Sequence, residues 1–405
     1  MIISQKIDSV LGFLSYFVYT RIYCPIKAFL MRRKSQINVI FIITELGVWK
    51  TENLYLKMKQ HPKFNPVIRV LPSTENICAK GEVVAYLNAK GYEYECIDAD
   101  ESLQKRFKAD IIFYQKPYLW VYSSQHTFLK NKRSLFCYVT YSFHDVVSDY
   151  ICNQPFFKYI WQYYFENQKC ADETASVMDN KGYNINITGI PMSDAFLLPS
   201  ELYHAHWKPQ LRLKKKIIWA PHFSVSDGDV LAYSTFLKYH QFMVEQAVKY
   251  KSQVQLLFKP HPLLFPRLCQ LWGQSKVEEY YALWANMDNT QVGFGQYIDY
   301  FMTSDAMIHD CGSFTIEYMY TQKPVMYLLK SDSDIHDSNL NSLAKNSFHL
   351  HYMGKSEQDI ESFIQDVIEG RDILADERTH FFKTNLLPPN GKTACDNIID
   401  AILGN

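Results

Sequence analysis

The stretch at residues 297–329, YIDYFMTSDAMIHDCGSFTIEYMYTQKPVMYLL, constrains the fold of this chain more than any other. Residues 306–309 are a short apolar run closed by polar residues and a glycine, which predicts a buried strand. Residues 315–321 predict a helix, and residues 324–329 predict a second buried strand. A strand, a tight turn, a helix and another strand make a βαβ unit, which normally belongs to a parallel sheet.

The turn inside this unit is Asp310-Cys311-Gly312-Ser313, where the carboxyl end of a strand meets the amino end of a helix. Backbone N–H groups at such a point favour an anion, and the Ser313 hydroxyl adds a donor. Glu317 lies one helical turn beyond Ser313 on the same face, where its carboxylate suits ribose hydroxyls. The alternatives are a corner of small residues that only packs, and a glutamate that is solvated or stabilises the helix.

Length and composition bound the class of protein. The 405 residues are too many for one ordinary domain, so we expect two. With 47% apolar and 21% charged residues, the chain can build a large core. Lys plus Arg and Asp plus Glu number 42 each, which excludes an overall basic field for nucleic acid. The nine cysteines include no CxxC pair, which favours reduced thiols in a cytoplasmic protein over a disulfide scaffold or a zinc site.

The amino-terminal segment has the pattern of an interfacial helix. Residues 10–20 are almost wholly apolar or aromatic, but this run is too short to span a bilayer. A second apolar run at residues 26–31 leads into the basic cluster at residues 32–34. Apolar and aromatic residues followed by basic ones are typical of a helix on an anionic leaflet, so we predict that residues 1–35 contact the membrane surface. The alternative is a helix packed on the domain with its basic end solvated.

Strand candidates alternate with helical segments along the rest of the chain, which predicts α/β domains. We place a first domain at residues 36–205 and a second at residues 206–405, because the alternation lapses near residues 200–212. Two doubly wound domains that face each other are the architecture of GT-B transferases, by analogy of fold. The other predicted strands are residues 37–44, 66–71, 94–97, 111–114, 135–141, 185–190, 217–220 and 253–258. The other predicted helices are residues 51–60, 77–89, 231–249, 277–286, 356–369 and 393–403.

Two loops of the second domain follow predicted strands and carry candidate phosphate ligands. Lys259 and His261 lie in a Lys-Pro-His-Pro segment whose prolines stiffen the loop. A cation and an imidazole donor suit a diphosphate, whose charge grows on the leaving side as a phosphoester bond breaks. His222 and Ser224 follow another strand in the same way. The alternatives are a His261 that caps backbone carbonyls and a His222 that only packs.

His144 is the candidate general base of the first domain. It follows a predicted strand, and the unperturbed pKa of a histidine near neutrality suits removal of a proton from a hydroxyl acceptor. Asp145 is a candidate to orient it, although neighbours on an extended chain point apart. A structural histidine is the alternative.

A metal site is not predicted. Asp332-Ser333-Asp334 has the spacing of a metal-binding DxD pair, but such triplets are common in polar loops. The cation, imidazole and hydroxyl donors above are expected to neutralise a diphosphate without a metal or another cofactor.

Four segments together resemble the CDP-glycerol glycerophosphotransferase family of teichoic acid and capsule synthesis. They are IIWAPHFS, LLFKPHP, the stretch at residues 297–328, and NITGIPMSDAF at residues 186–196, which looks like the family's element between its domains. The resemblance covers mainly residues 136–330. Two departures stand out: the turn at residues 310–313 replaces one tyrosine and one serine of the family's pattern, and the glycine that usually follows the family's first histidine is missing after His144.

The resemblance implies a GT-B fold and transfer of a polyol phosphate from a CDP-activated donor to an acceptor hydroxyl, with release of CMP. Residues 36–205 would be the acceptor side and residues 206–405 the donor-nucleotide domain. His144 would match the family's base, His261 the donor-phosphate histidine and Ser313 the second serine of the turn. A lipid-linked or saccharide acceptor and a peripheral position on the cytoplasmic face of the cell membrane follow from the same resemblance.

Two other classes of function remain open on the sequence. One is a nucleotide-sugar glycosyltransferase or epimerase that uses the same fold. The other is a non-catalytic scaffold on the membrane that binds a partner in capsule assembly.

Overall fold

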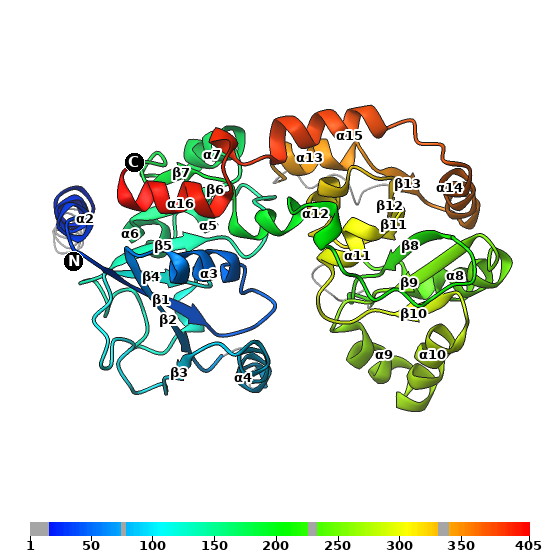
Figure 1. Cartoon of the computed structure of the whole chain (residues 1–405), viewed down its shortest axis with the longest axis horizontal. Coiled ribbons are helices and arrows are strands. Elements are labelled where there is room, and N and C mark those ends of the chain that lie inside the picture. The colour runs from blue at the N-terminus through cyan, green and yellow to red at the C-terminus, as the bar shows by residue number, and fades with distance from the viewer. Residues whose placement is uncertain (1–15, 74–77, 226–232, 331–339) are drawn as a thin grey trace, which may run out of the picture. The chain divides into compact units, whose positions relative to one another are not determined.

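The computed structural model describes residues 16–73, 78–225, 233–330 and 340–405, and they form two α/β units. Residues up to Ala195 together with Pro388–Asn405 make the first unit, and Phe196–Leu387 make the second. Each unit is built around its own parallel sheet with helices (Figure 1). The prediction of two doubly wound α/β domains is therefore confirmed.

The first unit has a seven-stranded sheet in the order β3-β2-β1-β4-β5-β6-β7, with every pairing parallel. Because the chain moves outward from β1 to β3 and then returns to place β4 on the other side of β1, the loops after β1 and β4 separate at the carboxyl edge. This is the topological switch point, where ligands of such sheets bind. The strands are β1 (Ile37–Ile43), β2 (Phe64–Val70), β3 (Tyr94–Cys96), β4 (Ile111–Tyr114), β5 (Leu135–Val139), β6 (Gln162–Phe165) and β7 (Ile185–Ile187).

The central strands of this sheet are buried almost throughout, because helices cover both faces. Phe41 of β1 stacks on Phe113 of β4 with ring centroids 4.8 Å apart. The main helices are α2 (Cys24–Arg32), α3 (Glu52–Gln60), α4 (Ala79–Lys90), α5 (Asp149–Cys152), α6 (Pro155–Tyr159), α7 (Gln168–Val177) and α16 (Ala394–Leu403).

The second unit repeats this topology with six parallel strands in the order β10-β9-β8-β11-β12-β13. Its switch point lies between β8 and β11, and β11 matches the strand predicted at residues 306–309. The strands are β8 (Lys215–Ala220), β9 (Val254–Phe258), β10 (Thr290–Val292), β11 (Ala306–His309), β12 (Val325–Leu328) and β13 (Tyr352–Gly354). The helices are α8 (Phe236–Lys249), α9 (Leu264–Trp272), α10 (Gln274–Asn286), α11 (Ile298–Thr303), α12 (Phe314–Glu317), α13 (Ser342–Phe348), α14 (Glu357–Glu369) and α15 (Ala375–Phe381).

Trp219 of β8 organises the core of the second unit. Its indole stacks on Phe236 of α8 at 5.6 Å and on Phe258 of β9 at 5.1 Å, and it also contacts Trp284 of α10. Aromatic stacking between strand and helix fixes the ends of β8 and β9, from which the Pro221 and Lys259 loops begin.

The carboxyl-terminal helix α16 belongs to the first unit (red beside blue and green elements in Figure 1). The prediction that residues 388–405 belong to the second domain is therefore wrong. Instead, Asp194 accepts hydrogen bonds from the backbone N–H groups of Ala394 at 2.7 Å and Cys395 at 2.9 Å. Gln162 of β6 donates to the carbonyl of Ala401 at 3.0 Å. The partner of α16 is distant in sequence, so periodicity alone did not reveal it.

Replacing Asp194 by alanine is expected to lower the free energy of unfolding of the first unit by about 1–3 kcal/mol, because buried N–H groups at the start of α16 lose their acceptor. Denaturant unfolding would measure the loss, and limited proteolysis near residue 390 should become faster. The control is Asp172→Ala, which removes a carboxylate of α7 in the same unit that pairs only with the exposed Gln168 side chain among the described residues. Equal stability of the Asp194 variant and the wild type would contradict this capping role.

The amino-terminal prediction falls partly outside the described residues, which begin at residue 16. The described part is a π-helical turn at Tyr19–Tyr23 followed by α2. Lys27 and Lys34 pair with Asp110 at 3.4 and 2.6 Å, and Arg32 donates to the carbonyl of Ile402 at 2.8 Å. These basic side chains therefore bind the first unit. Within the described ranges, every helix falls short of the length and apolarity needed to span a bilayer.

Candidate functional site

In the second unit, the predicted residues lie on the loops that follow β8, β9 and β11. Neighbouring parallel strands end at the same edge of a sheet, so residues from three distant segments meet there. His222 and Ser224 follow β8, Lys259 and His261 follow β9, and Asp310 follows β11. The βαβ unit predicted around residues 310–313 thus supplies one of the three loops that meet at this edge.

Asp310 holds two of these loops together. Its side chain is buried, and Oδ1 accepts a hydrogen bond from the backbone N–H of His222 at 2.5 Å. Oδ2 accepts from the backbone N–H and the hydroxyl of Thr235 at 2.6 and 2.8 Å. Burial raises the pKa of Asp310 to about 6, although these hydrogen bonds oppose the rise. The buried Asp310 carboxylate therefore fixes the position of the loop that follows β8 relative to the loop that follows β11.

The two histidines of the site both present an Nε2–H group. Nδ1 of His222 accepts from the Ser224 backbone N–H at 3.3 Å and lies 2.7 Å from the Ser224 hydroxyl. Nδ1 of His261 accepts from the backbone N–H of Leu263 at 3.1 Å. A neutral imidazole that accepts at Nδ1 carries its proton on Nε2. With ring centroids 5.3 Å apart, the histidines form a pair of neutral donors.

Lys259 supplies a buried amine beside this pair. Burial lowers the pKa of Lys259 to about 8, while the nearby Cys311 and Glu317 raise it. The amine donates to the carbonyl of Gly295 at 3.3 Å. Burial, His222 and Lys259 lower the pKa of His261 to about 4, so this imidazole is neutral at physiological pH. An anion at this edge would meet an ammonium and two imidazole N–H donors.

The remaining predicted residues differ in exposure. Ser313 is exposed at the start of the short helix α12, next to the half-buried Gly312. Glu317 is only 3% exposed, which excludes the solvated glutamate considered above. Burial and the Glu317 carboxylate raise the pKa of Tyr297, so the two side chains lie close together. Glu317 thus lies beneath the edge, beside the charge of Lys259.

In the first unit, His144 lies in a short hydrogen-bonded chain. Glu166 accepts from the His144 backbone N–H at 2.6 Å through one carboxylate oxygen and binds Nδ1 at 2.7 Å through the other. Nε2 lies 2.7 Å from the hydroxyl of Tyr163, and the ring stacks on Phe165 at 3.8 Å. Because a carboxylate only accepts, Nδ1 carries the proton and Nε2 accepts from Tyr163. In this arrangement the lone pair of Nε2 points toward the Tyr163 hydroxyl.

Sequence reasoning missed Glu166 and proposed Asp145 for the orienting role. Glu166 directly follows β6, a strand that was not predicted because its aromatic residues are flanked by polar ones. The run of Tyr163, Tyr164 and Phe165 was the available signal, since aromatic residues favour strands. The carboxylate at Nδ1 of His144 is that of Glu166, and no local pattern in the sequence indicates this contact. Burial raises the pKa of Asp145.

The switch point of the first unit carries a second polar network that sequence reasoning missed. Oε1 of Gln115, just after β4, accepts from the backbone N–H and the hydroxyl of Thr44 at 2.6 and 2.7 Å. Its amide donates to the carbonyl of Glu45 at 2.6 Å. Lys116 pairs with the Glu45 carboxylate at 2.8 Å, and this carboxylate also accepts from Ser73. The loops after β1 and β4 are thereby locked together.

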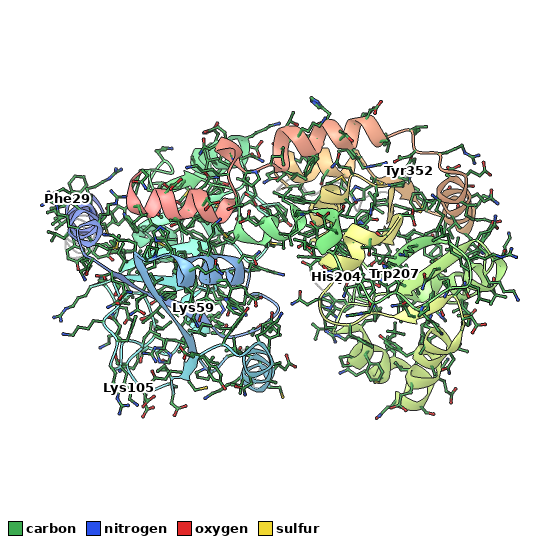
Figure 2. The ribbon with its side chains drawn as sticks, in the orientation of Figure 1. Phe29, Lys59, Lys105, His204, Trp207 and Tyr352 are labelled. Carbon is green, nitrogen blue, oxygen red and sulfur yellow. The ribbon has the colours of Figure 1, made fainter. Side chains whose placement is uncertain are left out.

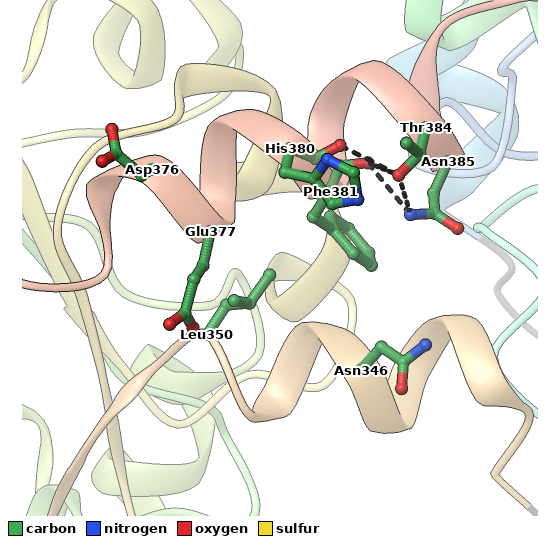
Figure 3. Close-up of a pocket in the computed structure, with 8 residues that line it drawn as sticks. All are labelled: Asn346, Leu350, Asp376, Glu377, His380, Phe381, Thr384 and Asn385. Carbon is green, nitrogen blue, oxygen red and sulfur yellow. Dashed lines mark hydrogen bonds between the residues drawn. The ribbon is translucent and has the colours of Figure 1, made fainter.

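A groove elsewhere in the second unit is lined by none of the predicted residues. Figure 3 shows it between α13 and α15, with Asp376, Glu377 and His380 on one wall and Asn346 on the other. The Thr384 hydroxyl on this wall donates a hydrogen bond to the carbonyl of His380 at 2.9 Å. Among the described residues, no cluster of three His, Cys, Asp or Glu side chains is arranged to hold a metal ion. The triplet at residues 332–334 lies outside them.

Comparison with protein-family models and with curated protein sequences finds no match. Solved structures do match. The wall teichoic acid polymerase TagF is 14% identical with a TM-score of 0.60, over 98% of this chain and 97% of that one. UDP-GlcNAc 2-epimerase from Neisseria meningitidis bound to UDP-GlcNAc is 13% identical with a TM-score of 0.56, over 91% and 100%. S. aureus MnaA with UDP is 12% identical with a TM-score of 0.55, over 91% and 96%. At these identities the likeness establishes the fold, and this chain has the two-domain GT-B-like architecture of those proteins.

Proposed function

We propose that the protein is a transferase that moves a polyol phosphate, such as glycerol or ribitol phosphate, from a CDP-activated donor to an acceptor hydroxyl. The observation that carries this proposal is the edge of the second unit, where the Lys259 amine adjoins the Nε2–H donors of His222 and His261. Such donors bind the oxygens of a diphosphate, and they stabilise most strongly the negative charge that develops on the leaving group as the phosphorus–oxygen bond breaks. The TagF neighbour, whose structure was also solved after a CDPG soak, supports the choice of donor.

In the proposed reaction, the acceptor hydroxyl attacks the phosphorus that bears the polyol. A new phosphorus–oxygen bond forms to the acceptor, and the bond to the bridging oxygen of the diphosphate breaks, so that CMP leaves. The acceptor's proton passes to His144, with Tyr163 as the relay, because the Tyr163 hydroxyl already lies 2.7 Å from Nε2. Glu166 stabilises the imidazolium that results, since it binds Nδ1–H.

The second unit would hold the donor. The Lys259 ammonium would neutralise charge on the diphosphate, and the neutral His261 imidazole would donate to its oxygens through Nε2–H. The exposed Ser313 hydroxyl would add a donor together with the N–H groups near Gly312. The Glu317 carboxylate is proposed to accept hydrogen bonds from the ribose hydroxyls. Asp310 and Ser224 act indirectly, because their side chains hold the His222 loop.

A donor screen with the purified protein tests this function. Release of CMP from CDP-glycerol or CDP-ribitol, dependent on an acceptor, is the expected result. Release of UDP from a UDP-sugar, or epimerisation of UDP-GlcNAc, would instead support the rival that the epimerase neighbours favour. Polymer synthesis that persists in cells with the His261→Ala variant would favour a non-catalytic scaffold.

We also propose that α2 and the turn before it lie on an anionic membrane surface. The buried side of this segment packs on the first unit through Cys24, Ala28 and Met31. Phe29 lies on the outer side of α2, where the Arg33 guanidinium covers its ring at 3.9 Å (Figure 2). The side chains exposed by 45–55% on the outer side are Phe17, Val18, Ile22, Ile26, Phe29 and Leu30. Their spacing of three to four residues makes one apolar stripe.

The triple substitution Ile26→Ser, Phe29→Ser and Leu30→Ser is expected to weaken binding to vesicles with anionic lipid by at least about tenfold, since each large apolar side chain that leaves lipid costs more than 1 kcal/mol. Co-sedimentation measures the binding. The matched control changes two exposed leucines of the second unit, Leu211 and Leu213, to serine. Unchanged sedimentation of the triple variant would reject the membrane contact.

A further inference from the structure

The loop that follows β4 projects from the switch point of the first unit and has a rigid base. The Gln115 side chain ties it to Thr44, and the Lys116–Glu45 pair buries the one cation of residues 115–122. The backbone N–H of Lys116 also lies 2.8 Å from the hydroxyl of Tyr122, so the loop is closed from both ends. A loop anchored in this way at a switch point is suited to present side chains to a ligand.

What the loop presents is aromatic. The Trp120 side chain is 63% exposed, and its ring stacks on that of Tyr118 with centroids 4.7 Å apart and an interplanar angle of 16°. The Tyr118 hydroxyl lies 3.4 Å from that of Tyr141, in the loop after β5. Trp120 is thus an exposed apolar ring backed by Tyr118, and the half-buried hydroxyls of Tyr118 and Tyr141 lie close to each other beside it. We call these three residues, Tyr118, Trp120 and Tyr141, the aromatic platform.

The aromatic platform is continuous with the His144 chain. Burial chiefly, and nearby groups that include the Tyr118 and Tyr138 hydroxyls, raise the pKa of Tyr163. The Tyr118 hydroxyl therefore lies near that of Tyr163, which binds Nε2 of His144. Tyr141 precedes His144 by three residues on the same loop. A ligand on the platform would thus be next to the proposed base.

We propose that the aromatic platform binds a sugar ring of the acceptor, so that the acceptor of the proposed reaction carries a saccharide at its reacting end. A pyranose has apolar C–H faces and hydroxyl edges, which match an exposed aromatic ring with hydroxyls beside it. The identification of this sugar as the acceptor rests on the proposed function. The binding of a sugar to the platform is argued from the geometry of the first unit.

Two other occupants fit the surroundings less well. A phosphate would need an exposed cation, whereas Lys116 is buried against Glu45. A lipid surface would need the platform beside the apolar stripe of α2, but α2 binds Asp110 at the amino end of β4. The four residues of β4 separate the two ends by about 13 Å at 3.3 Å per residue.

The test is binding of disaccharides built from hexoses or N-acetylhexosamines, chitobiose among them, to the full-length protein, measured by saturation-transfer NMR without donor. Trp120→Ala is expected to weaken binding about tenfold or more, a stacking loss of about 1.4 kcal/mol, and Trp120→Phe to weaken it less. The control Leu129→Ala removes another exposed apolar side chain of the same connection and should bind as the wild type does.

In turnover, Trp120→Ala should raise KM for a saccharide acceptor about tenfold with kcat nearly unchanged, because a platform holds the acceptor without reacting. CMP release with an unchanged acceptor KM would overturn the platform while leaving the proposed function intact. Sugar binding that depends on Trp120 without any CMP release would support the platform and contradict the proposed function. The platform is also rejected if no disaccharide binds, or if Trp120→Ala impairs vesicle binding in place of sugar binding.

Discussion

Replacing Glu166 by glutamine is expected to slow CMP release by about 10²–10⁴-fold, the usual contribution of a general base. Glu166 accepts two hydrogen bonds from His144, one from the backbone N–H and one from Nδ1–H. The two hydrogen bonds go to different carboxylate oxygens, so a glutamine in the same place presents its NH2 group to one of the two N–H groups. It can therefore favour the other tautomer, whose Nε2 carries the proton. The loss should appear in kcat, because the imidazolium is stabilised only as the proton arrives.

Asp145→Asn is the matched control for this experiment. Asp145 is adjacent in sequence to His144, yet the hydrogen bonds at the imidazole come from Glu166 and Tyr163. We expect its rate to change by less than about fivefold, within 1 kcal/mol. Thermal unfolding of both variants separates a catalytic loss from a folding defect. A larger effect of Asp145→Asn than of Glu166→Gln, at equal stability, would return the orienting role to Asp145.

Replacing Lys259 by methionine is expected to lower kcat/KM for the donor by about 10²–10³-fold, as for the loss of one donor to developing charge. The acceptor KM should not change. The same amine predicts a pH dependence. Burial lowers the pKa of Lys259 to about 8, so the free enzyme loses the positive charge above this pH. Donor kcat/KM should therefore be highest below pH 8 and fall about tenfold per pH unit above it.

Two further variants identify the titrating group. Lys259→Arg keeps its charge at all accessible pH values, so it should remove the alkaline fall in donor kcat/KM. Lys323→Met is the matched control, because burial also lowers the pKa of Lys323 to about 8. Its amine donates to the carbonyls of Met302 and Ser304, before the start of β11. An unchanged alkaline fall in Lys259→Arg would show that another group titrates.

The buried imidazoles of the second unit predict acid sensitivity. Burial lowers the pKa of His351 to about 3 and that of His261 to about 4, against about 6.5 in the unfolded chain. Between these values the unfolded state binds more protons, so the stability that these groups contribute is present above pH 6.5 and is lost as the pH falls. Asp310, whose pKa is raised, acts in the opposite direction below pH 6. Thermal unfolding between pH 7 and pH 4 would measure the balance, and His351→Gln should flatten it.

The strands with strong apolar runs were predictable from sequence. Residues 111–114 and 306–309 were expected as strands and are β4 and β11. Continuous burial on both faces requires apolar side chains at every position, and a run of them is visible without any knowledge of neighbours. The edge strands β10 and β13 were missed, because each has only three residues and neither, as Thr-Gln-Val and Tyr-Met-Gly, contains an apolar run.

The histidines and Lys259 were likewise predictable as candidates, since their residue types and their positions after apolar strands are local features. Their roles depend on partners elsewhere in the chain. Glu166 reaches His144 only because β5 and β6 pair in the sheet, and Asp310 reaches His222 only because β8 and β11 are neighbours.

By itself, the amino-acid sequence determined the class of fold and the loops on which the chemistry is expected, because strand and helix periodicity and turn residues act over short distances. Only the tertiary structure decided that Glu166 orients His144, that Asp310 lies beneath the site, and that α16 returns to the first unit. Each of these depends on which strands and helices become neighbours, and contacts between residues far apart in sequence arise from the packing of the whole unit.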